Sequence, residues 1–237
     1  IRESMSPIGQ ELRESTFAMT RLCGRVRPND ADLMAVTFGI EEESVLLRPD
    51  TLVPADVGLQ AVKDLQNACP GVIVREYMPS QIEFATPVCE NATEAMEAVS
   101  AFRYELGEWA AAHGVVAAGS GTPFFARTSE EGWEGRYREI ADHVQLLSSG
   151  HHINGQHVHI GIPDAETGVR ALNALRPWLP MLLALSSNSP FWHGVDTGFA
   201  SWRAIHSRRW TTYGIPPWCD SADEYTRMVA AQVGIGA

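Results

Sequence analysis

The chain has 237 residues, of which 45% are hydrophobic, and it carries a formal net charge of −11 at pH 7. The acidic balance and the lack of an extended basic cluster argue against a nucleic-acid-binding protein. No apolar run approaches the roughly 18 residues of a membrane span, and the four cysteines show no CxxC spacing. We therefore expect a cytoplasmic protein with reduced thiols and no membrane partner.

The expected secondary structure begins after an N-terminal stretch of mixed charge. Residues 1–32 end in the turn-rich sequence RVRPND and are assigned to an arm or helix before the main fold. In chain order, the expected strands are residues 33–47, 71–78, 79–88, 115–120 and 155–163, with the second and third forming a hairpin. The expected helices are residues 54–68, 91–114, 133–150, 164–190 and 221–233, the fourth interrupted at Pro177 and Pro180, with a Trp- and Arg-rich loop region before the last.

These elements predict an α+β fold. Hairpin-like strand pairs among long helices favour a mainly antiparallel sheet with helices packed on one face and the active site on the other. The apolar rows on two strands, Ile82 with Phe84 and Val158 with Ile160, are expected to face the helices.

Polar side chains alternate along three of the expected strands. In the sequence GIEEES, Glu41 and Glu43 share one face of the strand, and Glu42 points to the other. If the three strands are neighbours, one polar surface contains Glu41, Glu43, Gln81, Glu83, His157 and His159.

The carboxylates of this surface predict a metal site. Glutamates gathered on a half-covered sheet face repel each other unless a cation compensates them, and oxygen ligands suit Mg²⁺ or Mn²⁺. We therefore predict that Glu41, Glu43 and Glu83 bind the metal. Two alternatives stay open: a solvated glutamate run, and a zinc site in which His157 and His159 are completed by a third histidine or a carboxylate.

Several longer motifs point to a family. GIEEE, PSQIEFATPVC, GSGTPF, RYREI, NGQHVHIGIPD, SPFWHGVDTGFASWR and GIPPW follow one another in this order. Together they resemble the type 2 glutamate–cysteine ligase (carboxylate–amine ligase) family of the glutamine synthetase-like superfamily, from about Val36 onward. Members of that family continue beyond the last expected helix, so the resemblance implies that residues 33–237 are a catalytic domain that is incomplete at its C-terminal end.

The resemblance also implies a reaction and roles for residues. ATP with Mg²⁺ (or Mn²⁺) phosphorylates a carboxylate, that of glutamate in the named activity, and the amine of cysteine then attacks the acyl phosphate to form a γ-glutamyl amide. Glu41, Glu43 and Glu83 correspond to the metal ligands, and His157 to a residue near the transferred phosphate. Arg203 is expected to bind phosphate or substrate carboxylate, with a structural salt bridge as its alternative role. The expected substrate-binding residues are Gln81, His159 and Arg209.

Two other functions remain as alternatives at this point. One is a zinc-dependent amidohydrolase-type enzyme that uses His157 and His159. The other is a non-catalytic nucleotide-binding protein that retains a ligase fold. The expected partners are small molecules, and the sequence leaves the identity of the two substrates and assembly into a homo-oligomer open.

Overall fold

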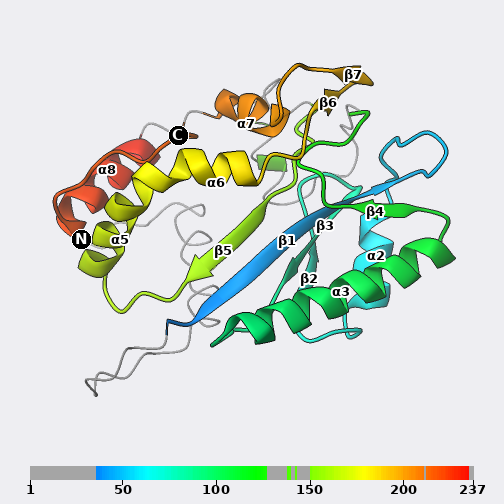
Figure 1. Cartoon of the computed structure of the whole chain (residues 1–237), viewed down its shortest axis with the longest axis horizontal. Helices are drawn as coiled ribbons and strands as arrows, with labels where there is room; N and C mark the ends of the chain where they lie inside the picture. Colours follow the sequence, from blue (N-terminus) through cyan, green and yellow to red (C-terminus); the bar gives the residue numbers. More distant parts are fainter. Residues whose placement is uncertain (1–35, 127–137, 140–141, 143–149, 211, 235–237) are drawn as a thin grey trace, which may run out of the picture.

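A single antiparallel sheet organises the fold. The computed structural model describes residues 36–126, 138–139, 142, 150–210 and 212–234. The long strand β1 pairs along one edge with β3, which in turn pairs with β2 (Figure 1). The other edge of β1 is shared, because its N-terminal half pairs with β5 and its C-terminal half with β4. The strands are β1 (Phe38–Leu47), β2 (Val72–Arg75), β3 (Gln81–Ala85), β4 (Val116–Ala118) and β5 (Gln156–Ile160).

One face of this sheet packs against two helices, α2 (Gly58–Leu65) and α3 (Ala92–Ala112). Leu46 of β1 and Ile82 and Phe84 of β3 point to this face and are fully buried, and each contributes about 2 kcal/mol of burial free energy. Phe84 of β3 stacks on Phe102 of α3 with 4.4 Å between the ring centroids. The core includes Leu46, Ile82, Phe84, Phe102 and Leu106.

Helix α3 begins and ends where its sequence predicts. The side chain of Asn91 accepts a hydrogen bond from the backbone N–H of Glu94, and the Glu94 carboxylate accepts one from the N–H of Glu90. The first bond satisfies a backbone donor that the first helical turn leaves without a partner, and the second ties the residue before the N-cap to the helix. After the helix, Gly114 adopts a left-handed conformation with φ of 65°, as expected for a glycine that terminates a helix.

The second part of the chain forms helices beyond β5 and a small hairpin (Figure 1). Pro177 and Pro180 interrupt the predicted long helix, as expected, and a short 3₁₀ turn separates its two halves. A hairpin and a short helix occupy the region that we predicted to be loop. These elements are α5 (Ala165–Leu175), η2 (Arg176–Trp178), α6 (Leu179–Leu185), β6 (Phe191–Trp192), β7 (Val195–Asp196), α7 (Trp202–His206), η3 (Ser207–Arg209) and α8 (Ala222–Gly234).

The α+β architecture and the hairpin of β2 and β3 confirm the predictions from sequence. One packing prediction is wrong, because Val158 and Ile160 of β5 are 59% and 52% exposed. The reason is their place at the edge: the buried core lies between β1, β2, β3 and the helices α2 and α3, and β5 extends past it. The predicted helix 133–150 lies largely outside the described residues.

Two further features of the described residues concern the cysteines and the helices. Cys69, Cys89 and Cys219 are free thiols, and Cys23 lies outside the described residues. None of the helices within the described ranges combines the length and the apolar character needed to cross a membrane.

Candidate active site and metal centre

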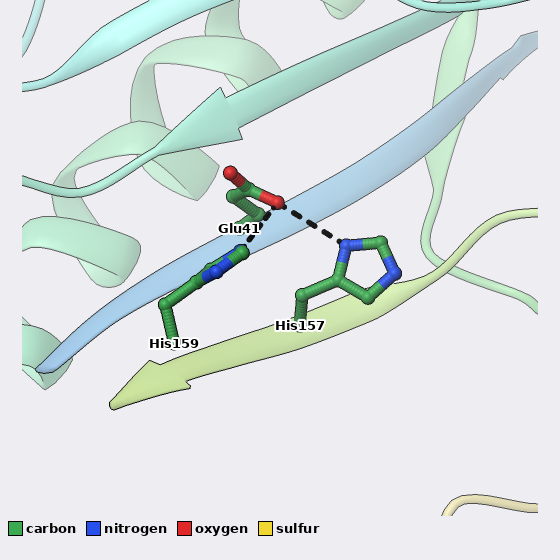
Figure 2. Close-up of side chains that lie close together, drawn as sticks. All are labelled: Glu41, His157 and His159. Carbon is green, nitrogen blue, oxygen red and sulfur yellow. Dashed lines mark hydrogen bonds and ion pairs between the residues drawn. The ribbon is translucent and has the colours of Figure 1, made fainter. Parts of the chain in front are cut away.

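The pairing of β1 with β5 brings one glutamate and two histidines together. Glu41 lies directly opposite His157, and His159 is two pairs further along the same ladder, opposite Gly39. The Oε2 atom of Glu41 is 3.2 Å from Nδ1 of His157 and 2.8 Å from Nε2 of His159 (Figure 2). Within the described ranges, this is the one group of three potential metal-binding side chains whose ligand atoms all lie within 4.8 Å of one another.

The contact between Glu41 and His159 is short without being a good hydrogen bond. The Nε2 atom of His159 is buried from solvent, yet it makes no hydrogen bond of acceptable geometry at its 2.8 Å distance from Glu41. A carboxylate oxygen and an imidazole nitrogen can lie this close without a hydrogen bond when both direct a lone pair at the same cation. The donor atoms present therefore fit a metal ion.

A second pair of carboxylates lies next to this group. Glu43 of β1 is directly opposite Glu83 of β3, on the same face of the sheet as Glu41. Burial raises the pKa of Glu43, and burial together with the negative charges of Glu76, Glu41 and Glu43 raises the pKa of Glu83 to about 8. Without a compensating cation, Glu83 therefore keeps its proton at neutral pH.

Glu42 has a different environment, as the strand alternation predicted. It is buried against α3, where Arg103 donates hydrogen bonds from Nε and Nη2 to its two carboxylate oxygens, the first at 2.9 Å. This bidentate ion pair ties β1 to the helix layer. Glu42 thus stabilises the fold from the face opposite to Glu41.

Arg203 of α7 approaches the carboxylates from outside the sheet. Its Nε–H donates to the carbonyl oxygen of Asn154 at 2.6 Å, and its positive charge acts to lower the pKa of Glu43. Gly155 lies where these groups meet: a Cβ atom on this residue would be 3.1 Å from Nη2 of Arg203, 3.1 Å from Nε2 of His157 and 3.3 Å from Oε1 of Glu43. The absence of a side chain at this position lets the guanidinium, the imidazole and the carboxylate converge.

A large open cavity adjoins this point. Its volume is about 1030 Å³, which is sufficient for a ligand of nucleotide size. Glu43 and Arg203 contribute to its wall, as does the ion pair of Glu42 and Arg103. The glycine-rich segment 119–121 and small residues of the C-terminal part of α3 complete it. The cavity thus places the carboxylate of Glu43 next to space that a substrate can enter.

Comparison with known proteins identifies the family. The sequence model of glutamate–cysteine ligase family 2 matches residues 37–237. The chain belongs to this family.

Curated relatives support the same assignment. A protein of Saccharopolyspora erythraea named "Putative glutamate–cysteine ligase 2-2" is 40% identical over 207 residues, which cover 85% of this chain and 53% of the relative. "Putative glutamate–cysteine ligase 2-1" of Rhodococcus jostii is 38% identical, with 85% and 55% covered, and "Putative glutamate–cysteine ligase 2" of Salinispora tropica is 36% identical, with 86% and 54% covered. The chain spans about half the length of the curated relatives it matches.

Two of the predicted substrate-binding residues of this family member are engaged with protein groups. Gln81 is 1% exposed, and its Nε2 donates to the carbonyl of Ile153 at 2.6 Å and to Oδ1 of Asn154 at 2.7 Å. Arg209 lies on η3, where Nη2 is 2.8 Å from Nδ1 of His206. Gln81 thus supports the segment before β5, and Arg209 packs against a histidine.

The histidine beside Arg209 is held in one neutral form. Because a guanidinium can only donate, Nδ1 of His206 accepts from Arg209 and its Nε2–H faces the carbonyl of Gly150 at 3.2 Å. Burial, reinforced by the charge of Arg209, lowers the pKa of His206 to about 4, and burial lowers that of the neighbouring His151 to about 3. These imidazoles are uncharged at neutral pH.

Sequence reasoning missed two residues that position the site, Asn154 and Gly155. Each bonds to groups that are distant in the chain, as described below. The Asn-Gly pair directly before the strand QHVHI was the available signal, because it indicates a tight backbone conformation next to functional side chains.

Proposed function

We propose that this chain forms part of the catalytic domain of an ATP-dependent carboxylate–amine ligase of the glutamate–cysteine ligase type. The observation that carries the proposal is the cluster of Glu41, His157 and His159 beside the buried pair Glu43 and Glu83. Of these residues, Glu43 lies on the wall of a cavity of nucleotide size. Membership of glutamate–cysteine ligase family 2 supports the reaction class. Glutamate and cysteine are the substrates that the names of the relatives suggest.

The candidate metal ligands of the site fall into two sets that differ in their donor atoms. Carboxylate oxygens of Glu43 and Glu83 suit Mg²⁺, which typically links protein carboxylates to substrate phosphates. The set of Glu41, His157 and His159 contains two imidazole nitrogens, which suit first-row transition metals better than Mg²⁺. We therefore expect Mn²⁺ to bind at this set more tightly than Mg²⁺ and to support the reaction in its place.

The proposed reaction has two steps. An oxygen of the substrate carboxylate attacks the γ-phosphorus of ATP, the bond to the β-phosphate oxygen breaks, and ADP leaves with an acyl phosphate formed. The amine nitrogen then attacks the acyl carbon, inorganic phosphate leaves, and the nitrogen loses a proton. Divalent cations held by Glu41, Glu43 and Glu83 would neutralise charge on the transferred phosphoryl group.

Arg203 and His157 are the protein groups proposed to act on that phosphoryl group. The guanidinium of Arg203 is fixed through Nε, which leaves its two Nη groups to donate to phosphate oxygens. Nε2 of His157 lies on the Gly155 side, close to this guanidinium. Both groups therefore stabilise charge where the phosphoryl group is transferred, and positioning of this kind accounts for most catalysis of phosphoryl transfer.

A zinc-dependent amidohydrolase is the second candidate, and one observation favours it. Glu41 completes a set of two histidines and one carboxylate, which is also the ligand set of many catalytic zinc sites. Zinc at this set would activate a water molecule for hydrolysis of an amide instead of supporting its formation.

Two measurements on the full-length protein separate these functions. The first is ADP release in a screen of amino acids and amines with ATP and Mg²⁺ or Mn²⁺, with glutamate and cysteine as the leading pair. The second is the metal content of protein purified without added metal. ADP formation that requires both an acid and an amine supports the ligase. One equivalent of zinc with amide hydrolysis and no ADP would favour the hydrolase, and ATP binding without turnover would favour a non-catalytic protein.

A further inference from the structure

Asn154 is a buried polar residue that lies between the glycine-rich segment and the carboxylate surface. It is 4% exposed, and both polar atoms of its side chain have protein partners. Nδ2 donates to the carbonyl of Ser120 at 2.7 Å, and Oδ1 accepts from Nε2 of Gln81 at 2.7 Å. Its backbone N–H donates to the carbonyl of Gly121 at 3.0 Å.

A chain of hydrogen bonds fixes the orientation of this amide. The backbone N–H of Met78 donates to Oε1 of Gln81 at 3.1 Å, so the Nε2 of Gln81 must face Asn154. Oδ1 of Asn154 then faces Gln81, and its Nδ2 faces Ser120. The side-chain amides of Gln81 and Asn154 each have one orientation in which every donor faces an acceptor. The position of Asn154 is therefore set by β3 and by the glycine-rich segment.

The peptide that follows this side chain holds two residues of the proposed active site. The carbonyl oxygen of Asn154 accepts from Nε–H of Arg203 at 2.6 Å. The N–H of Gly155 donates to Oε2 of Glu43 at 2.8 Å, and the N–H of Glu43 donates to the carbonyl of Gly155 at 3.0 Å. Arg203 and Glu43 are therefore both bonded to the short segment that Asn154 anchors.

We propose that Asn154 is the positioning residue of the phosphoryl-transfer site, which aligns Arg203 with Glu43 through the peptide that follows it. This role rests on the proposed function for its effect on rate, because Asn154 acts through Arg203 and does not itself touch the substrate. Removing the side chain would free the segment from Gln81 and Ser120 and let the acceptor of Arg203 shift. A displacement of about 1 Å in such a group can cost about 100-fold in rate.

The test compares Asn154→Ala with Asn173→Ala in the full-length protein. Asn173 is a matched control, because its side chain also makes two hydrogen bonds to a distant segment, Cys219, but at the contact of α5 with α8. The first measurement is the NMR signal of the Nε–H of Arg203 and its protection from solvent exchange. The second is steady-state ADP formation, measured alone and in an Arg203→Ala background.

We expect Asn154→Ala to abolish the exchange protection of the Arg203 Nε–H and to lower kcat about 100-fold, with a smaller change in KM. Asn173→Ala should leave the Arg203 signal and kcat unchanged. In the Arg203→Ala background, Asn154→Ala should lower kcat little further, since both changes remove the same interaction.

Three outcomes would overturn the proposal: an unchanged Arg203 signal in Asn154→Ala, a lost signal with wild-type kcat, or a kcat loss that adds fully to that of Arg203→Ala. If Asn154→Ala does not fold, Asn154→Ser, which keeps one hydrogen-bonding group, takes its place in the same measurements. If the wild-type protein forms no ADP with any substrate pair, the proposed function fails, and the NMR signal alone decides whether Asn154 positions Arg203.

Discussion

Glu41→Gln and Glu42→Gln make the same chemical change at adjacent positions of β1, and the structure predicts different results. At position 41 the change removes a negative charge from an oxygen that lies within 3.2 Å of two imidazole nitrogens. One pair of unit charges about 4 Å apart is worth about 4 kcal/mol at an effective dielectric constant of about 20, and the amide oxygen of glutamine recovers part of this as a weaker ligand. We therefore expect the affinity for Mn²⁺ to fall about 100-fold, which equals about 2.8 kcal/mol.

The matched change Glu42→Gln should leave metal binding unaltered. Glu42 faces α3, and its loss breaks the ion pair with Arg103, whose side chain is 61% exposed. Because solvent screens the exposed partner, the free energy of unfolding should fall by only about 1 kcal/mol. The effect of this substitution is thus expected on stability and not on the metal-binding set.

Three measurements on the full-length protein separate the loss of metal affinity from the loss of stability. They are isothermal titration with Mn²⁺, ADP formation and thermal unfolding. Glu41→Gln should bind Mn²⁺ about 100-fold more weakly and lose ADP formation, with a small change in melting temperature. Glu42→Gln should retain Mn²⁺ binding and ADP formation, and it should melt a few degrees lower. Equal losses of Mn²⁺ affinity in the two variants would refute the assignment of these glutamates to opposite faces, and wild-type Mn²⁺ affinity in Glu41→Gln would refute the metal centre.

Three further substitutions test other parts of the structure. Gly155→Ala places a methyl group 3.1 Å from Nη2 of Arg203, so ADP formation should fall at least about 10-fold with little loss of stability, as kinetics and thermal unfolding will show. Burial lowers the pKa of His206 to about 4, so between pH 6.5 and pH 4 only the unfolded chain binds the proton and stability falls with falling pH. His206 should contribute about 2–3 kcal/mol to this loss of stability, so urea unfolding of His206→Gln should show a shallower fall across that range. Phe102→Ala removes a fully buried ring that stacks on Phe84 and should cost about 3–5 kcal/mol in unfolding free energy, with unchanged Mn²⁺ affinity in the folded protein.

The alternation of side chains along a strand allowed much of the site to be predicted from the sequence. A period of two separates Glu41 and Glu43 from Glu42 without knowledge of any partner strand, and the structure has this separation. The same period places His157 and His159 on one face of β5. What the period cannot supply is the register between strands, which decides that Glu41 meets two histidines while Glu43 meets Glu83.

Features that depend on the edges of the sheet were less predictable. The apolar residues of β5 alternate like those of a covered strand, yet Val158 and Ile160 are exposed because the core that α2 and α3 cover includes residues of β1, β2 and β3 and none of β5. The role of Asn154 was also hidden, since its partners Gln81, Ser120 and Arg203 are each more than thirty residues away. Hydrogen bonds between such distant segments leave no periodic pattern in a sequence.

The divided edge of β1 explains why the site lies where it does. The pairing with β5 ends at Glu42, and the pairing with β4 begins at Val45. Between these points the two neighbouring strands diverge, and Glu43 bonds to Gly155 rather than to a continuous strand. A single neighbouring strand along the whole of β1 would fill this edge with its own backbone and side chains. The divergence instead gives Arg203 access to a buried carboxylate, so the discontinuity of the sheet edge is the feature that forms the candidate site on this polar face.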